Sequence, residues 1–227
     1  MGGSSFSIGP NLTVQEGELC YHPEGVEYGP QLDKEDGTNH ILLILHFGGV
    51  SGQGYVAYEE LLSVQKSLSE KGRFEGGRYF PTSEGEKNGE ERGIDGFQAT
   101  WEKINGRELA YPDPKYAAPV LMKAGNFGWV KDETAKGVWK KALGIFTERE
   151  TRAEMVRIDE GGKWEAKAGG NALQLIFVTK GSGSVGEMGL ERESAVRLLP
   201  GERGMMFESR EEMEMLRWVI PQVEQTQ

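Results

Sequence analysis

Short apolar segments separated by glycine turns are the feature that most constrains the fold of this chain. Glycine accounts for 33 of the 227 residues, and much of it stands in pairs, at 48–49, 76–77, 161–162 and 169–170. The pairs follow no fixed repeat and are not concentrated in one segment, which excludes a collagen-like chain and a flexible linker. Turns between short strands explain this distribution, so the sequence predicts an all-β barrel or sandwich.

The strand candidates are concentrated in the second half of the chain. They are the segments 119–122, 143–148, 153–158, 173–179, 195–199 and 213–219. The first half predicts two strands over 12–30 with a turn at 16–18, and an apolar strand over 39–47. One helix is predicted over 55–70, because its leucines recur at helical spacing and Gly72 follows it. The polar, glycine-rich segment 75–96 predicts a surface loop.

Charge and cysteine content limit the partners and the compartment. The formal net charge is −10 and the isoelectric point is near 5.0, so the chain lacks the basic surface that nucleic acids and anionic membranes require. Cys20 is the only cysteine, which excludes an intrachain disulfide and fits a reducing compartment. No apolar run reaches the length that spans a bilayer. We therefore expect a cytoplasmic protein.

The strand 173–179 and the turn after it carry a family resemblance. Gln174, Ile176 and Val178 share one face of this strand, and glycines follow at 181 and 183. The segment resembles the first motif of the cupin superfamily, in which two histidines and a glutamate precede a strand that ends in glycine. Gln174 occupies the glutamate position, and the histidine positions fall at about 167–170, where no histidine stands. The resemblance implies that Gln174 points into a barrel, where a buried amide needs partners from protein, water or ligand.

A second resemblance, to the second cupin motif, occurs twice. In the first half this motif is matched by a Gly-Glu pair at 17–18, where one strand turns into the next, and by the segment 23–25. Tyr28 stands where the motif has a histidine. In the second half it is matched by the corner 201–202 alone, and the segments 12–18 and 196–202 also resemble each other. The chain is most similar to a fungal-type, RmlC-like protein with two cupin-like units. The predicted fold is an all-β, cupin-like barrel (a double-stranded β-helix) with an incomplete first unit and one or two helices.

The domain boundaries follow from this resemblance. We expect a first, incomplete cupin-like unit over 1–53, a helix and a polar connecting segment over 54–116, and a second cupin-like barrel over 117–227. The incomplete first unit leaves strand edges unpaired, so a homodimer is expected.

A metal site has few candidate ligands. His40 and His46 share one side of their predicted strand, but six residues at about 3.3 Å each separate them by roughly 20 Å. His22 offers a second ligand to one of them across strands, completed by Tyr28 or a carboxylate. We predict no metal and no cofactor; a metal-dependent cupin dioxygenase stays as the alternative.

Acid–base chemistry without a metal has two candidate locations. In the first unit, His22, Tyr28 and His46 are the predicted catalytic residues, because an imidazole titrates near neutrality and a phenol can stabilise an enolate. Substrate-binding candidates are Gln31 in the first unit, and Gln174 and Trp218 in the second. The fungal-type resemblance implies an isomerase or cyclase of secondary metabolism that acts on a small, largely apolar, polyketide-like molecule. A non-catalytic binding or dimerisation module is a further alternative.

Overall fold

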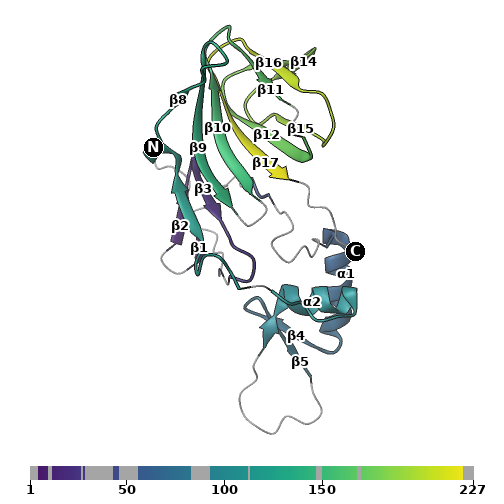
Figure 1. Ribbon diagram of the computed structural model, residues 1–227. Helices are drawn as coiled ribbons and strands as arrows, with labels where there is room; N and C mark the ends of the chain where they lie inside the picture. Colours follow the sequence, from purple (N-terminus) through teal and green to yellow (C-terminus); the bar gives the residue numbers. More distant parts are fainter. Residues whose placement is uncertain are drawn as a thin grey trace. The chain divides into compact units, whose positions relative to one another are not determined.

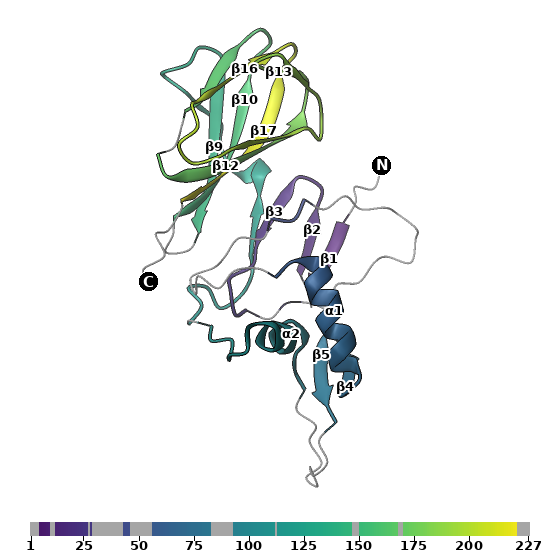
Figure 2. The same ribbon diagram turned by 90° about the vertical axis from the view of Figure 1, so that its right-hand side faces the viewer.

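The described part of the chain forms two compact units. In the computed structural model, the described residues are 5–9, 12–26, 28, 43–45, 56–82, 93–111, 113–146, 150–167 and 170–221. One unit comprises Met1–Glu16 and His22–Val120, and the other comprises Gly17–Tyr21 and Leu121–Gln227 (Figures 1 and 2). The predicted domain boundaries at 53–54 and 116–117 stay predictions.

The second unit is built from two antiparallel sheets. The larger sheet has the strand order β15-β12-β17-β10-β9-β8, and the smaller has the order β11-β16-β13-β14 (Figure 1). Their bounds are β8 (Val130–Lys131), β9 (Val138–Phe146), β10 (Thr151–Ile158), β11 (Lys163–Ala166), β12 (Ala172–Lys180), β13 (Gly183–Val185), β14 (Met188–Leu190), β15 (Ala195–Leu198), β16 (Met205–Ser209) and β17 (Met213–Pro221).

The order of strands β10 to β17 is that of a jelly roll. The chain passes from one sheet to the other between β10, β11, β12 and β13, and passes back from β14 to β15, β16 and β17. This path places β17 between β10 and β12, and it places β16 between β11 and β13. Two interlocked Greek keys of this kind make the double-sheet jelly roll that cupins share. The predicted all-β, cupin-like fold of the second half is therefore confirmed.

The core of the second unit lies between its two sheets. Strand β12 explains how the sequence builds this core, because its residues alternate between buried and half-buried from Ala172 to Thr179. Trp164 on β11 packs on Phe207 of β16, with ring centroids 5.4 Å apart. The fully or nearly fully buried core side chains are Val138, Val156, Ile158, Trp164, Ala166, Ile176, Val178, Val185, Leu190, Leu198, Phe207, Met213 and Met215.

A glycine closes the turn after β12. Gly181 has a φ of +80°, and a side chain at this position would overlap the backbone carbonyl of Glu212. Only glycine can adopt that φ without strain and also leave room for the backbone of Glu212, which lies just before β17. Position 181 is thus fixed by the packing of the barrel itself.

The larger sheet carries a second apolar layer on its outer face. Strand β3 (Glu18–Tyr21) pairs with β7 (Val120–Lys123), and the 3₁₀ turn η1 (Ala124–Asn126) follows β7. Tyr21 stacks on Phe146 of β9 with ring centroids 4.6 Å apart, and Lys123 pairs with Glu18 at 3.3 Å. The hairpin segment around β3 therefore belongs to the second unit in space, although it precedes most of the first unit in sequence.

The first unit combines short antiparallel pairs with two helices. Its described elements are β1 (Ser5–Gly9), β2 (Leu12–Gln15), α1 (Tyr58–Ser69), β4 (Gly72–Glu75), β5 (Arg78–Pro81), β6 (Ile94–Asp95) and α2 (Gly96–Asn105). Strand β1 pairs with β2, and β4, β5 and β6 form one sheet. Neither helix in the described ranges is long and apolar enough to cross a membrane.

Helix α2 has clear capping at both ends. The Asp95 carboxylate accepts a hydrogen bond from the Gln98 backbone N–H at 2.9 Å, and the Thr100 hydroxyl donates to the Gly96 carbonyl at 2.7 Å. Gly106 ends the helix in the left-handed conformation. The helix buries Trp101, so its inner face belongs to the core of the first unit.

Several sequence predictions need correction or lie outside the described residues. The helix over 55–70 is confirmed as α1, but the predicted surface loop over 75–96 is wrong at β5 and β6. None of the four strands of the smaller sheet was predicted from the sequence. The predicted strand 39–47 lies mostly outside the described residues. The described strands of the first unit do not form a second jelly roll, because β1 and β2 pair only with each other and β4, β5 and β6 form a separate sheet.

Candidate functional site

Gln174 is the polar centre of the barrel interior. It lies on β12 with 1% of its surface exposed, on the inward face that it shares with Ile176 and Val178. Its side-chain Nε2 donates to the Lys167 carbonyl at 2.8 Å. Its Oε1 accepts from Arg217 twice, from Nε at 3.0 Å and from Nη2 at 2.7 Å. The expected inward orientation is therefore what the structure has, and the amide is satisfied by protein partners.

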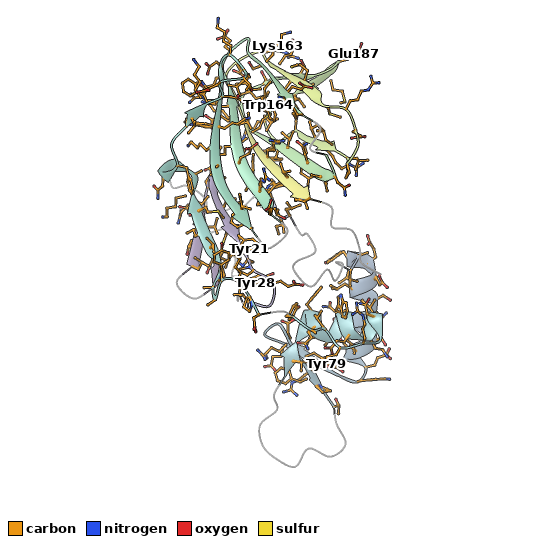
Figure 3. The ribbon with its side chains drawn as sticks, viewed as in Figure 1. Tyr21, Tyr28, Tyr79, Lys163, Trp164 and Glu187 are labelled. Carbon is orange, nitrogen blue, oxygen red and sulfur yellow. The ribbon has the colours of Figure 1, made fainter. Side chains whose placement is uncertain are left out.

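Arg217 places a positive charge in the same interior. It lies on β17, and its Nη1 donates to the Glu154 carboxylate on β10. Its guanidinium carbon is 5.5 Å from the centre of the Trp164 ring, a distance typical of a cation–π contact. Trp164, labelled in Figure 3, lies between the two sheets. We call Glu154, Trp164, Gln174 and Arg217 the barrel cluster.

The strand register explains why these side chains meet. Glu154 of β10 is directly opposite Arg217 of β17, and Gln174 of β12 is directly opposite Val219, two residues further along β17. Directly opposed and diagonal neighbours on one face of a sheet are close enough for long side chains to touch. Three adjacent strands thus each contribute one polar residue to the same place.

The barrel cluster is partly open to solvent. The side chains of Arg217 and Glu154 are 15% and 22% exposed. Ala142, which is opposite Glu154 on β9, is exposed. A guanidinium carries five N–H donors, of which three have partners among the described residues. The remaining donors can bind an oxygen atom of a small molecule.

Trp218 does not face the barrel cluster. It is opposite Leu175, the neighbour of Gln174 in β12, so Trp218 and Gln174 project from opposite faces of the larger sheet. Trp218 is buried on the outer face, 6.5 Å from Phe146 between ring centroids. Trp218 therefore does not belong to the barrel cluster, and its predicted role in substrate binding stays a prediction. Its indole N–H has no hydrogen-bond partner within the described ranges.

His22 and Tyr28 are brought together in the first unit. Their ring centroids are 4.4 Å apart with the rings tilted by 49°, and Tyr28 is 52% exposed. Burial lowers the pKa of His22 below its ordinary value, and its Nδ1 has no partner among the residues described. Gln31, His40 and His46 lie outside the described residues.

A metal ion finds no ligand set in the described ranges. They contain no group of three or more histidine, cysteine, aspartate or glutamate side chains that could hold one. At the position that the resemblance assigns to a glutamate ligand, the Gln174 oxygen is engaged by the Arg217 guanidinium. A second cation beside that guanidinium would be repelled. The residues of the barrel cluster therefore do not fit a metal.

Sequence reasoning missed Glu154 and Arg217, although a signal existed. In the segment 153–158, Glu154 has the same parity as Val156 and Ile158, and in 213–219 Arg217 has the same parity as Met213. One acidic and one basic residue on two otherwise apolar faces predict a buried ion pair if the strands are neighbours. The pairing of those strands was the missing information.

Comparison with known proteins finds matches among solved structures. Neither a protein-family model nor a curated protein matches the chain. Among solved structures, KdgF from Halomonas sp. is 17% identical with a TM-score of 0.39, and the match covers 47% of this chain and 96% of that one. An RmlC-like cupin from Shewanella frigidimarina is 16% identical with a TM-score of 0.35, covering 44% and 88%. Ectoine synthase from P. lautus is 14% identical with a TM-score of 0.34, covering 41% and 69%.

Proposed function

We propose that this protein is a metal-independent, cupin-type enzyme that binds a small, largely apolar organic molecule at the barrel cluster. The single observation that carries the proposal is the Arg217 guanidinium, held inside an apolar barrel by Gln174 and Glu154 with donors to spare. A few convergent polar groups in an apolar interior are typical of small-molecule sites. A fixed cation there favours a ligand with an oxygen that carries or develops negative charge.

The class of reaction follows from the same residues. A guanidinium and a carboxylate side by side can stabilise an oxyanion and exchange a proton, which is what an isomerase or cyclase of carbonyl compounds requires. The fungal-type resemblance supports a place in secondary metabolism with a polyketide-like substrate. No redox group is needed for such a reaction.

Native mass spectrometry of the purified protein tests the binding. We expect a small organic ligand to co-purify with the wild-type chain and to be lost from Arg217→Met. Lys163→Met is the matched control, because Lys163 forms a surface ion pair with Glu208 and does not belong to the barrel cluster. A ligand that stays bound to a folded Arg217→Met protein would contradict the proposed site.

The His22–Tyr28 pair is a second candidate for the acid–base site. The ring contact favours it, because the two predicted catalytic side chains are neighbours and the Tyr28 phenol is accessible. If the reaction occurs there, Tyr28→Phe and His22→Gln each lower turnover by about 10²-fold, the effect of losing one oxyanion donor or one acid–base group. Full activity in both variants, with unchanged circular dichroism, would rule this candidate out.

The protein is further proposed to act as a cytoplasmic homodimer. Strands β8 and β15 end the larger sheet, and β11 and β14 end the smaller, so the described barrel presents edges that a second copy can cover. Sedimentation equilibrium at micromolar concentration should give twice the 25.1 kDa chain mass; a monomer would refute the dimer.

Burial raises the pKa of the Cys20 thiol to about 11, which makes it a poor nucleophile and fits a structural cysteine.

A further inference from the structure

We infer that Glu154 is the proton carrier and Arg217 the oxyanion holder of the barrel cluster, and that the substrate is a ketone with a double bond that migrates into conjugation. This inference rests on the proposed function and gives its site a substrate class. It assigns the chemistry to two residues that neither the motif resemblance nor the His22–Tyr28 pair involves.

An acid–base group and a hydrogen-bond donor are adjacent in the barrel cluster. Glu154 and Arg217 face each other across β10 and β17, and the Arg217 Nη1 donates to the Glu154 Oε1. The Glu154 Oε2 has no hydrogen-bond partner among the described residues, and two guanidinium N–H groups are also available there. In an enolisable ketone the carbonyl oxygen and the acidic C–H are likewise neighbours. One molecule can therefore contact both side chains.

The Arg217 guanidinium is held in a fixed position. Gln174 accepts from two of its nitrogens, and the Trp164 ring covers it at 5.5 Å. A donor that is held in place before the reaction stabilises developing charge more effectively than a mobile one, especially in a site with little water. Gln174 is thus a positioning residue. Its own amide is engaged with Arg217 and with the Lys167 carbonyl.

The Glu154 carboxylate is accessible from solvent. The exposed Ala142 lies opposite Glu154 on β9, so the carboxylate is at the solvent-accessible side of the cluster. The deeper residues on the same inward faces, Val156, Ile176 and Met215, are fully buried and apolar. A small ketone can therefore approach the cluster with its polar end from the side of Ala142, not through the buried interior.

The reaction balances without a co-reactant. The Glu154 carboxylate removes a proton from the carbon between the carbonyl and the double bond. The electron pair of that C–H bond forms a dienolate, whose oxygen accepts hydrogen bonds from Arg217. The same proton then returns to the far carbon of the dienolate, the double bond ends in conjugation with the carbonyl, and Glu154 is again a carboxylate. Nothing is oxidised or reduced.

The test uses a β,γ-unsaturated cyclohexenone and follows the ultraviolet absorbance of the conjugated product. The wild-type protein is expected to accelerate conversion above the buffer rate. Glu154→Gln keeps an oxygen acceptor for Arg217 and should lower the catalysed rate by about 10²-fold or more. Arg217→Lys should lower it by about 10²-fold. Glu208→Gln, which removes a surface carboxylate paired with Lys163, should leave the rate unchanged.

The possible outcomes separate this inference from the proposed function. Binding of the ketone is measured by quenching of tryptophan fluorescence, with Arg217→Met as the reference. If the ketone binds at the cluster but Glu154→Gln is as fast as wild type, or wild type is no faster than buffer, the inference is wrong and the binding site stands. If no small molecule is bound at the cluster, in this assay or after purification, both are wrong. Loss of rate in the two cluster variants alone, with circular dichroism unchanged, supports the inference.

Discussion

Replacing Gln174 by leucine should destabilise the barrel through Arg217 rather than through packing. Leucine fills much of the space of the glutamine side chain on the inward face of β12. The substitution removes the acceptor of two Arg217 N–H groups and the donor to the Lys167 carbonyl. Arg217 then keeps Glu154 as its hydrogen-bonding partner among the residues described.

The magnitude follows from those contacts. A hydrogen bond to a charged group contributes about 1.5–3 kcal/mol, and the Lys167 bond adds about 1 kcal/mol. The two Arg217 bonds share one acceptor, so we count them as one strong interaction. Burying an apolar side chain in place of the amide returns about 1–2 kcal/mol, and the partial exposure of Arg217 lets water replace some of the loss. The expected net destabilisation is about 2 kcal/mol.

A double-mutant cycle isolates the interaction. Urea unfolding of Gln174→Leu, Arg217→Met and the double variant is monitored by tryptophan fluorescence, with separate transitions fitted because two units can unfold independently. We expect a coupling free energy of about 1–3 kcal/mol between Gln174 and Arg217. The matched cycle on Lys163 and Glu208, whose side chains are 61% and 48% exposed, should give at most about 1 kcal/mol.

One result would refute this reasoning. If Gln174 and Arg217 are coupled by less than about 0.5 kcal/mol, their effects are additive. Gln174 would then contribute only through its own burial, and it could not be the residue that positions the guanidinium.

Three further predictions concern single positions. Gly181→Ala should destabilise the second unit by about 3 kcal/mol or more in urea unfolding, because position 181 has a positive φ and the added methyl group would overlap backbone atoms. Gly186 has a φ of +57° and open space around it, so Gly186→Ala should destabilise the unit by only about 1–2 kcal/mol. Hydrogen bonds from Lys140 and Thr134 lower the pKa of Asp132 to about 2, so Asp132→Asn should be less stable than wild type above pH 4. The difference should shrink as the pH falls from 4 through 2, and a constant difference would contradict this. Burial lowers the pKa of His22 below 6.5, so the folded state disfavours protonation of the imidazole. The free energy of unfolding should therefore fall as the pH drops below 6.5. His22→Gln should reduce this dependence on pH when unfolding is measured between pH 5 and 7.5.

Much of the fold of the second unit was readable from local pattern. The alternation of Gln174, Ile176 and Val178 predicts β12, and the cupin resemblance implies that this face points inward. The burial of the three residues agrees with both. The strands of the smaller sheet were missed because they contain three to five residues each, and β13 and β14 include glycine. Such short strands are stabilised by pairing with neighbours that are distant in the sequence, which a local pattern cannot show.

The candidate site shows the same limit more sharply. Parity along each strand is readable, but the register between strands is not, and a shift of one residue exchanges the two faces. Trp218 and Gln174 therefore looked compatible with one pocket, while the pairing of Gln174 with Val219 places the tryptophan on the outer face. The same register brings Arg217, one residue before Trp218, to the inside. The cation of the barrel cluster comes from the neighbouring strand, and not from a position that the cupin motif assigns to a metal ligand.

The position of β17 has a consequence for how the barrel forms. This strand is the last of the jelly roll in the sequence, yet it lies between β10 and β12 and carries Arg217. Until it is inserted, the facing edges of β10 and β12 have no partner, and such edges can pair with other chains. Pairings between segments so far apart in the sequence are slow to form. We therefore expect slow refolding with a concentration-dependent loss of yield, and we expect the proposed ligand site to form only in the final step of folding.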